Sequence, residues 1–263
     1  MNILDTIIAK KKIEVAENKR NKRISELENG PFFKNKTLSF KDFLLRKDKT
    51  GIIAEFKRRS PSKGIINNTS TVVDVTTDYV KYGASAVSIL TDEAFFGGSL
   101  NDLLEATVNE VPILRKDFII DEYQLIESKA YGAEIILLIA ACLSKEDVQK
   151  LSGFAKNIGL NVLLEIHNEQ ELEHICDDVD VIGINNRDLK SFKVDISRSI
   201  DLCIKIPGDK LKISESGIDD VKTIQLLKQH GFSGFLMGEK FMKEQDPGKA
   251  FADFVKEFDN TNF

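Results

Sequence analysis

Short apolar segments recur along most of the chain, and segments with helical periodicity separate most of them. The apolar segments are rich in Ile, Val and Leu, and each has the length of one buried strand. We predict eight strands, at Ile52–Phe56, Ala86–Leu90, Pro112–Lys116, Glu134–Ile139, Asn161–Glu165, Val181–Asn185, Leu211–Glu215 and Gly234–Met237. Helices are predicted at Val72–Tyr82, Asn101–Glu110, Asp121–Ala130, Lys145–Ile158, Glu169–Cys176, Ile196–Ile206 and Asp219–His230.

The order of these segments predicts the fold class. Strands this far apart in the sequence do not form hairpins, so we expect them to pair in parallel through crossover helices. Eight such units usually close on themselves, and we therefore predict an α/β protein with a (β/α)8 TIM barrel. The alternative is a doubly wound open sheet, which favours a GxGxxG turn after an early strand. The sequence lacks that turn.

Two helical segments precede the first strand. Residues 2–26 predict a helix whose apolar stripe consists of Ile3, Leu4, Ile7, Ile8 and Ile13. Phe40–Leu45 predicts a second, short helix with Ser39 as its N-cap. We expect residues 1–48 to be an N-terminal helical extension that covers one end of the core. Residues 49–259 would then form the barrel, within a single domain.

Composition and charge narrow the function classes. The chain has 263 residues, a net charge of −5 and an isoelectric point near 5.4, which argue against nucleic acid or an anionic membrane as its main partner. Its apolar runs are too short to span a bilayer, and its charged N-terminus has no signal-peptide core. Three scattered cysteines predict reduced thiols in a cytoplasmic protein: Cys142, Cys176 and Cys203. The three histidines lack metal-ligand spacing, so we expect no metal site.

The first predicted strand runs directly into a polar loop. Alternation along the strand places Ile53, Glu55 and Lys57 on one face, with a carboxylate and an ammonium towards the loop. The following Ser60-Pro61-Ser62 sequence breaks the strand and supplies hydroxyl and backbone N–H groups. When this stretch is considered alone, a structural salt bridge between Glu55 and Lys57 at the strand end explains it as well as a functional site does.

Polar residues collect at the carboxyl ends of other predicted strands as well. They are Lys116, Glu165, Asn185, Arg187, Glu215, Ser216, Gly217, Gly238 and Glu239. Active sites of such barrels lie at these ends. The alternative is a structural ring of ion pairs around the barrel mouth. Carboxylates and ammonium groups enclosed together shift each other's pKa values, which suits general acid–base catalysis without naming a reaction.

Two further features suggest a substrate with a phosphate and an apolar part. Ser216-Gly217 and Gly238-Glu239 follow the last two strands, where barrels commonly bind phosphate through backbone N–H groups. Ordinary turn glycines are the alternative. Phe96, beside the Gly97-Gly98 pair, and Phe118, just past Lys116, would form an apolar lid or wall. Core packing explains either phenylalanine singly.

Several motifs in the same order closely resemble those of the indole-3-glycerol phosphate synthase family. They are Ile53–Gly64, Leu90-Thr91-Asp92, Phe96-Gly97-Gly98-Ser99, Leu114–Phe118, Glu165, Ile182–Leu189, Ser214–Ile218 and Gly238-Glu239. The resemblance extends from about residue 3 to 242. It implies a (β/α)8 barrel in tryptophan biosynthesis that converts 1-(2-carboxyphenylamino)-1-deoxyribulose 5-phosphate into indole-3-glycerol phosphate, CO2 and water.

The resemblance also implies catalytic roles. Lys116 looks like the general acid that protonates the ketose carbonyl during ring closure, and Glu165 looks like the base or the electrostatic partner of the cationic intermediate. Glu55 and Lys57 resemble groups that serve dehydration and positioning. Asn185 resembles a further catalytic residue that orients the substrate.

The binding residues follow from the same resemblance. The residues that resemble the family's substrate-binding residues are Ser60, Phe96, Phe118, Arg187, Glu215 and Ser216. The two phenylalanines would lie around the anthranilate ring. The residues that resemble the family's phosphate-binding residues are Lys57, Ser216, Gly217, Gly238 and Glu239. For Glu239 only the backbone N–H, and not the side chain, would favour an anion.

No cofactor is expected, because restoring the aromatic ring drives loss of CO2 in this reaction. The expected partner is a small phosphosugar. We expect a monomer, and weak association with other enzymes of tryptophan biosynthesis stays open.

Two other functions compete with this interpretation. Phosphoribosylanthranilate isomerase, another phosphosugar barrel, would place a cysteine near the end of the first strand, where this chain has Glu55 and Lys57. A non-catalytic phosphosugar-binding barrel would not need the acids and bases. The sequence departs from the family pattern at Asn67-Asn68-Thr69-Ser70-Thr71, which replaces a more acidic, proline-containing stretch and leaves the conformation of that loop open.

Overall fold

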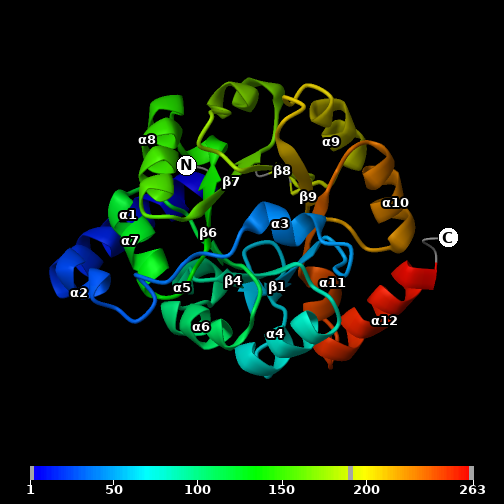
Figure 1. Cartoon of the computed structure of the whole chain (residues 1–263), viewed down its shortest axis with the longest axis horizontal. Helices are drawn as coiled ribbons and strands as arrows, with labels where there is room; N and C mark the ends of the chain where they lie inside the picture. Colours follow the sequence, from blue (N-terminus) through cyan, green and yellow to red (C-terminus); the bar gives the residue numbers. More distant parts are fainter. Residues whose placement is uncertain (1–2, 189–191, 261–263) are drawn as a thin grey trace.

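The computed structural model describes residues 3–188 and 192–260, and the strands in it form a closed parallel barrel surrounded by helices (Figure 1). Asn2, where the N-terminal helix is predicted to begin, and Leu189, the last residue of the Ile182–Leu189 motif, lie outside the described residues. The barrel strands are β1 (Ile52–Phe56), β4 (Ala86–Leu90), β5 (Ile113–Lys116), β6 (Ile135–Ile139), β7 (Asn161–Ile166), β8 (Val181–Asn185), β9 (Leu211–Glu215) and β10 (Gly234–Met237). Each lies within one residue of its predicted bounds. The barrel is therefore confirmed and the open sheet is wrong.

Helices follow the strands around the outside of the barrel. The α-helices after β1 are α4 (Val72–Lys81), α5 (Glu93–Phe96), α6 (Leu100–Glu105), α7 (Glu122–Ala130), α8 (Lys145–Asn157), α9 (Ile196–Cys203), α10 (Val221–Gln229), α11 (Glu239–Met242) and α12 (Pro247–Asn260). Short 3-10 helices are η1 (Ala106–Val108), η2 (Ala140–Cys142) and η3 (Glu169–His174). A small hairpin, β2 (Arg59–Ser60) and β3 (Gly64–Ile65), follows β1. Across residues 3–188 and 192–260, no helix is both long and apolar enough to cross a membrane.

Alternation along each strand separates two apolar cores. Ile53 of β1 belongs to the core inside the barrel, whereas Ala54 and Phe56 belong to the core between the strands and the helices. The inner core also contains Leu114, Leu137, Leu163, Val181, Ile213 and Leu236. The predicted alternation is therefore confirmed for β1, and it directs Glu55 into the barrel.

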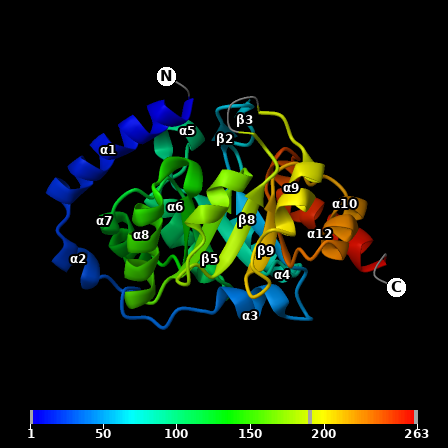
Figure 2. The same ribbon diagram turned by 90° about the horizontal axis from the view of Figure 1, so that it is seen from above.

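The second predicted helix, α3 (Phe40–Leu45), closes the amino end of the barrel. Its Phe40 and Leu44 join the inner core, and Ser39 caps it by accepting the Asp42 N–H as predicted. The Phe40 N–H donates to Asn161 at the start of β7. Figure 2 shows α3 at one end of the barrel, with the start of α1 and the β2–β3 hairpin at the other.

The helix predicted over residues 2–26 is in fact two helices, α1 (Ile3–Asn21) and α2 (Ile24–Glu28). The backbone is extended at Arg23, with φ −73° and ψ 151°. The Arg23 N–H donates to the Glu26 carboxylate at 3.2 Å, and such a capping contact starts a new helix. The predicted apolar stripe is also wrong at Ile13, whose side chain is 61% exposed.

Two segments predicted as barrel helices are partly or wholly 3-10 helices, and α9 ends at Cys203, three residues before its predicted end. The segment predicted over 101–110 ends as an α-helix at Glu105 and continues as η1. The segment predicted over 169–176 is the 3-10 helix η3. Asn168 accepts the Glu171 N–H, and the Glu171 carboxylate accepts the His167 N–H, so that side chains hold a tight turn at the start of η3.

Hydrogen bonds from one side chain shape the loop that departs from the family pattern. Asn67 Oδ1 accepts the N–H groups of Thr69 and Ser70, and its amide donates to the Met242 carbonyl at 3.2 Å. Thr71 then caps α4 by accepting the Asp74 N–H. An Asn-centred turn thus replaces the missing proline, and it ties this loop to α11.

The N-terminal helix is joined to the barrel by a buried lysine that the sequence pattern did not reveal. The Lys11 side chain is 1% exposed, and its ammonium lies 3.0 Å from Asp92 and 2.9 Å from Asp117. Burial would raise the pKa of Asp117, but the positive charges of Arg115 and Lys11 hold that pKa well below its usual value. Since Asp117 directly follows Lys116, this cluster connects α1 to the catalytic end of β5.

Replacing Lys11 with methionine should lower the stability of the fold. Removing one member of a buried ion pair leaves uncompensated charge, and we expect the free energy of unfolding to fall by about 3 kcal/mol. Urea denaturation measures this change. Lys12→Met is the matched control, because Lys12 is exposed on the same helix turn. Equal denaturation midpoints for the two variants would contradict the prediction.

Candidate active site

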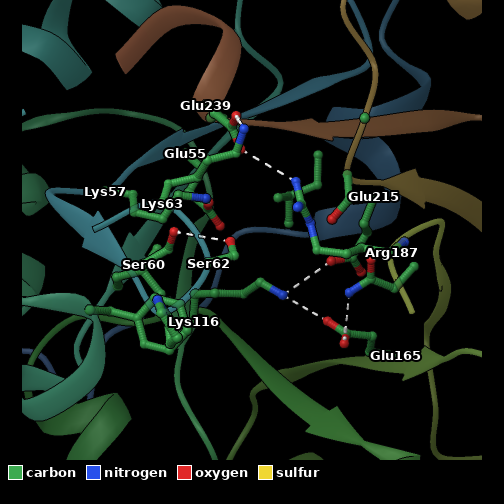
Figure 3. Close-up of a pocket in the computed structure, with 18 of the residues that line it drawn as sticks. Glu55, Lys57, Ser60, Ser62, Lys63, Lys116, Glu165, Arg187, Glu215 and Glu239 are labelled. Carbon is green, nitrogen blue, oxygen red and sulfur yellow. Dashed lines mark hydrogen bonds and ion pairs between the residues drawn. The ribbon is translucent and has the colours of Figure 1, made fainter. Parts of the chain in front are cut away.

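Every candidate site residue named from the sequence lines one pocket at the carboxyl end of the barrel. The set is Glu55, Lys57, Ser60, Phe96, Lys116, Phe118, Glu165, Asn185, Arg187, Glu215, Ser216, Gly217, Gly238 and Glu239. Figure 3 shows the side chains of Glu55, Lys116, Glu165 and Glu215 converging from strands on different sides of the barrel. The parallel strands place their carboxyl ends at the same edge, so residues far apart in sequence become neighbours.

Lys116 lies at the centre of the pocket floor. Its ammonium donates to Glu165 Oε2 at 2.7 Å and to Glu215 Oε2 at 3.1 Å (Figure 3). Burial alone would lower the pKa of Lys116, but the negative charges of Glu165, Glu215 and Glu55 raise it well above its usual value. Lys116 is therefore a protonated ammonium at neutral pH.

The two carboxylates beside Lys116 have different pKa values. Burial raises the pKa of both groups. For Glu165 the effect of burial is overcome by Lys116 and His167, which hold the pKa well below its usual value. For Glu215 burial prevails over Lys116, and the pKa rises to about 7. Glu165 is thus a stable anion, whereas Glu215 exchanges a proton near neutral pH.

Glu55 and Lys57 form a second acid–base pair at the end of β1. Their side chains lie 2.7 Å apart, and Glu55 also accepts a hydrogen bond of 3.3 Å from the Ser88 hydroxyl. Glu55 is buried, while Lys57 is partly exposed towards the pocket. The pair lies on the opposite side of the pocket from Glu165 (Figure 3).

Asn185 and Arg187 are oriented by their neighbours at the end of β8. The Asn185 amide donates to Glu165 Oε1 at 3.1 Å, and Asn185 Oδ1 accepts the Arg187 N–H at 3.0 Å. The Arg187 guanidinium reaches Glu239 at 3.3 Å, and Lys63 reaches the other oxygen of Glu239 at 3.2 Å. The Glu239 side chain therefore joins two cations across the mouth of the pocket, a contact that the sequence did not reveal.

The turns after β9 and β10 leave no room for side chains. A Cβ atom on Gly217 would lie 2.2 Å from Val194 Cγ1, and one on Gly238 would lie 2.8 Å from Glu55 Cβ. Within the described part of the chain, Ser216 and Phe192 are the only non-glycine residues with a positive φ. Asn186 supports the strained Ser216 backbone by donating to the Ser216 carbonyl at 2.6 Å. Glycine at these turns allows an anion to approach the backbone closely.

Apolar side chains line the side of the pocket between β4 and β6. The rings of Phe96 and Phe118 lie 6.2 Å apart, centroid to centroid. Gly98, which follows Phe96 and Gly97, is required on steric grounds, because a Cβ atom on Gly98 would lie 1.9 Å from the Leu90 carbonyl oxygen. The N-terminal helix adds Ile3, Leu4 and Ile7 to this wall. Its periodicity predicted that these residues are buried, but nothing in the sequence indicated a place in the pocket.

The sequence and the structure of the chain were compared with known proteins. The sequence matches the family model of indole-3-glycerol phosphate synthase over residues 4–254. It is 48% identical over 256 residues to indole-3-glycerol phosphate synthase of Bacteroides thetaiotaomicron, covering 97% of this chain and 98% of that protein. It is 44% identical over 260 residues to indole-3-glycerol phosphate synthase of Thermoanaerobacter pseudethanolicus, covering 97% of this chain and 98% of that protein.

Solved structures share the barrel at much lower sequence identity. Tryptophan synthase subunit alpha from Legionella pneumophila has a TM-score of 0.61 and 13% identity, covering 84% of this chain and 98% of that chain. The 3-hexulose-6-phosphate synthase from Salmonella typhimurium has a TM-score of 0.60 and 11% identity, covering 80% and 98%. These structures support the fold alone. The family model and the relatives together show that the chain belongs to the indole-3-glycerol phosphate synthase family, decarboxylating lyases of tryptophan biosynthesis.

Proposed function

We propose that Lys116 is the general acid of the ring closure that this family catalyses. The observation that carries the proposal is the position of its ammonium, between Glu165 and Glu215 on the pocket floor. Protonation of the ketose carbonyl by Lys116 would make its carbon electrophilic towards the ring carbon of the anthranilate part. The new C–C bond leaves a cationic, non-aromatic ring, and loss of CO2 returns its bonding electrons to that ring.

Glu165 is proposed to stabilise the cationic intermediate as a permanent anion. Its low pKa makes it a weak base, so electrostatic stabilisation suits it better than proton abstraction. Glu215, predicted from the family resemblance to bind substrate, has the pKa expected of a group that shares a proton with substrate near neutral pH. Asn185, which donates to Glu165, would orient both the carboxylate and the substrate.

Glu55 and Lys57 are proposed to serve the final loss of water. Dehydration needs an acid for the departing hydroxyl group and a base for the proton that is removed, and this pair supplies both types of group 2.7 Å apart. Which of the two acts on which atom follows from the orientation of the bound intermediate. Their distance from Glu165 across the pocket supports two separate acid–base steps.

The phosphate is proposed to bind between the turns after β9 and β10. Ser216, Gly217, Gly238 and the backbone of Glu239 would surround it, with Lys57, Ser60 and Arg187 contributing side chains. Arg187 and Lys63 are already neutralised by Glu239, so an incoming phosphate would compete with that carboxylate for the two cations. Anchoring the phosphate here and the aromatic ring beside Phe96 and Phe118 would fold the substrate for ring closure.

A cytoplasmic monomer acting on a free phosphosugar is proposed as the working state. The proposed acid, base and phosphate groups all come from one chain, and its three cysteines are free thiols. The family match favours this enzyme over phosphoribosylanthranilate isomerase and over a non-catalytic barrel. Tight product binding without turnover would instead identify the non-catalytic barrel.

Substitution of Lys116 by alanine tests the proposed acid. We expect kcat to fall at least about a hundredfold, because general acid catalysis typically contributes factors of that size or more. Indole fluorescence follows turnover of 1-(2-carboxyphenylamino)-1-deoxyribulose 5-phosphate, and the chain contains no Trp to obscure it. Lys150→Ala, at an exposed lysine, is the control. A loss of less than tenfold would remove Lys116 from this role.

Substitution of Gly238 by valine tests the phosphate site. We expect KM to rise about tenfold, equivalent to about 1.4 kcal/mol, because the new side chain blocks the phosphate. A smaller fall in kcat should accompany it, since the Cβ atom would also press on Glu55. Gly208→Val is the matched control, because a Cβ atom there meets nothing within 4 Å. An unchanged KM would place the phosphate elsewhere.

Carbon-13 NMR of labelled glutamate carboxyl groups tests the division of roles between Glu165 and Glu215. One carboxyl group should titrate with a pKa of about 7, and its signal should be missing from the Glu215→Gln variant. Because Lys116 lowers this pKa, Lys116→Met should move the titration to higher pH. Titration of Glu215 near pH 4 would refute the proposed proton exchange.

A further inference from the structure

A histidine outside the pocket contacts the carboxylate on its floor. His167 follows the last residue of β7, and its side chain is 7% exposed. Its Nε2 atom lies 3.1 Å from Glu165 Oε1, and its Nδ1 atom lies 3.2 Å from Glu171 Oε2. The ring thus lies between a carboxylate of the proposed active site and a carboxylate of η3.

The two contacts together specify the charge of the ring. A neutral imidazole has one N–H and one lone pair, so it would direct a lone pair at one of the two carboxylates. Only the imidazolium is attracted to both carboxylates. Because Nε2 lies close to Glu165 without forming a hydrogen bond, its attraction to Glu165 is electrostatic. Burial would lower the pKa of His167, but Glu165 and Glu171 raise it to about 9. The ring is therefore cationic at neutral pH.

The other titratable groups around the ring preserve this charge. Burial raises the pKa of the Cys142 thiol to about 12, so that thiol is neutral beside Glu165 and Glu171. Lys116 and Glu215 lie beyond Glu165 and are separated from the ring by its carboxylate. Hence Glu165 and Glu171 are the groups that determine the charge of His167.

Glu171 is itself held firmly in place. One of its carboxylate oxygens accepts the His167 backbone N–H at 2.7 Å, and the other accepts the Asn168 amide at 2.6 Å. Asn168 also caps η3. The start of η3 therefore fixes the ring from behind, as outer carboxylates fix ring orientation in many histidine sites.

We propose that His167, held by Glu171, is a positioning residue that keeps Glu165 ionised and directs Glu165 Oε2 towards Lys116. The inference rests on the role proposed for Glu165. Glu165 Oε1 accepts the Asn185 amide and lies 3.1 Å from His167 Nε2, and Oε2 accepts from Lys116, so the carboxylate has little freedom to rotate. The two cations on either side of Glu165 favour its anionic form throughout the reaction.

The experiment titrates the Glu165 carboxyl group by carbon-13 NMR in the wild-type chain and in His167→Gln, with Glu165→Gln to assign the signal. Loss of the imidazolium should raise the pKa of Glu165 by about one unit or more, since a nearby opposite charge typically shifts a carboxyl by one to three units. At neutral pH Glu165 stays ionised, but it loses the cation that orients it, so kcat should fall about tenfold. KM should change less than threefold, because His167 does not line the pocket.

Two further variants complete the test. Glu171→Gln leaves the imidazole in place but removes the charge behind it, so it should shift the Glu165 titration in the same direction by a smaller amount. It also serves as the test variant if His167→Gln does not fold. His230→Gln is the matched control, because His230 is exposed at the end of α10. This variant should change neither the pKa of Glu165 nor kcat.

An unmoved Glu165 titration in His167→Gln would overturn the inference, whether or not kcat falls. A fall in kcat that is accompanied only by a lower unfolding temperature would show a structural role and would overturn it equally. The proposed role of Glu165 is tested separately by Glu165→Gln. If that variant keeps nearly full kcat, the role of Glu165 fails; if it loses activity while His167→Gln leaves the titration unmoved, only the role of His167 fails.

Discussion

Backbone pairing between β1 and β10 closes the barrel, and the composition of the pocket depends on it. Ile53 pairs with Leu236 and Ala54 with Met237, so the next residues along, Glu55 and Gly238, are brought into contact. In an open sheet these strands would lie at opposite edges. Closure therefore joins the proposed dehydration pair to the proposed phosphate turn, although they come from opposite ends of the barrel sequence.

Inside the closed barrel, identical side chains acquire different chemistry from their neighbours. Glu165 and Glu215 both contact Lys116, and both are buried. Glu165 has His167 as a second cation, whereas Glu215 is repelled by Glu165 and Glu55. The second cation beside Glu165 and the repulsion of Glu215 together separate the pKa values of the two carboxylates. Such separation is how one site supports both acid and base chemistry near neutral pH.

Periodicity predicted the barrel and the inward direction of Glu55, because alternation and strand closure are properties of contiguous sequence. The roles of Phe96 and Phe118 depended on resemblance to a family, since a single phenylalanine suits a core equally well. Lys11 and His167 were missed for a different reason. A lysine within an amphipathic helix usually faces water, and its burial here depends on Asp92 and Asp117, whose positions follow only from the three-dimensional fold. His167 was missed although Glu165 and Glu171 are close to it in sequence, because its contact with both depends on the tight turn between β7 and η3.

The buried ammonium of Lys11 also constrains the order in which a nascent chain assembles. Helix α1 is synthesised before the barrel, whereas Asp92 leaves the ribosome after the second barrel strand and Asp117 after the third. Burying the ammonium before then would be costly, because no carboxylate of the barrel would yet neutralise it. Contacts between such distant segments also form slowly. The pocket wall contributed by Ile3, Leu4 and Ile7 is thus translated before the barrel but docks only after the third barrel strand has formed.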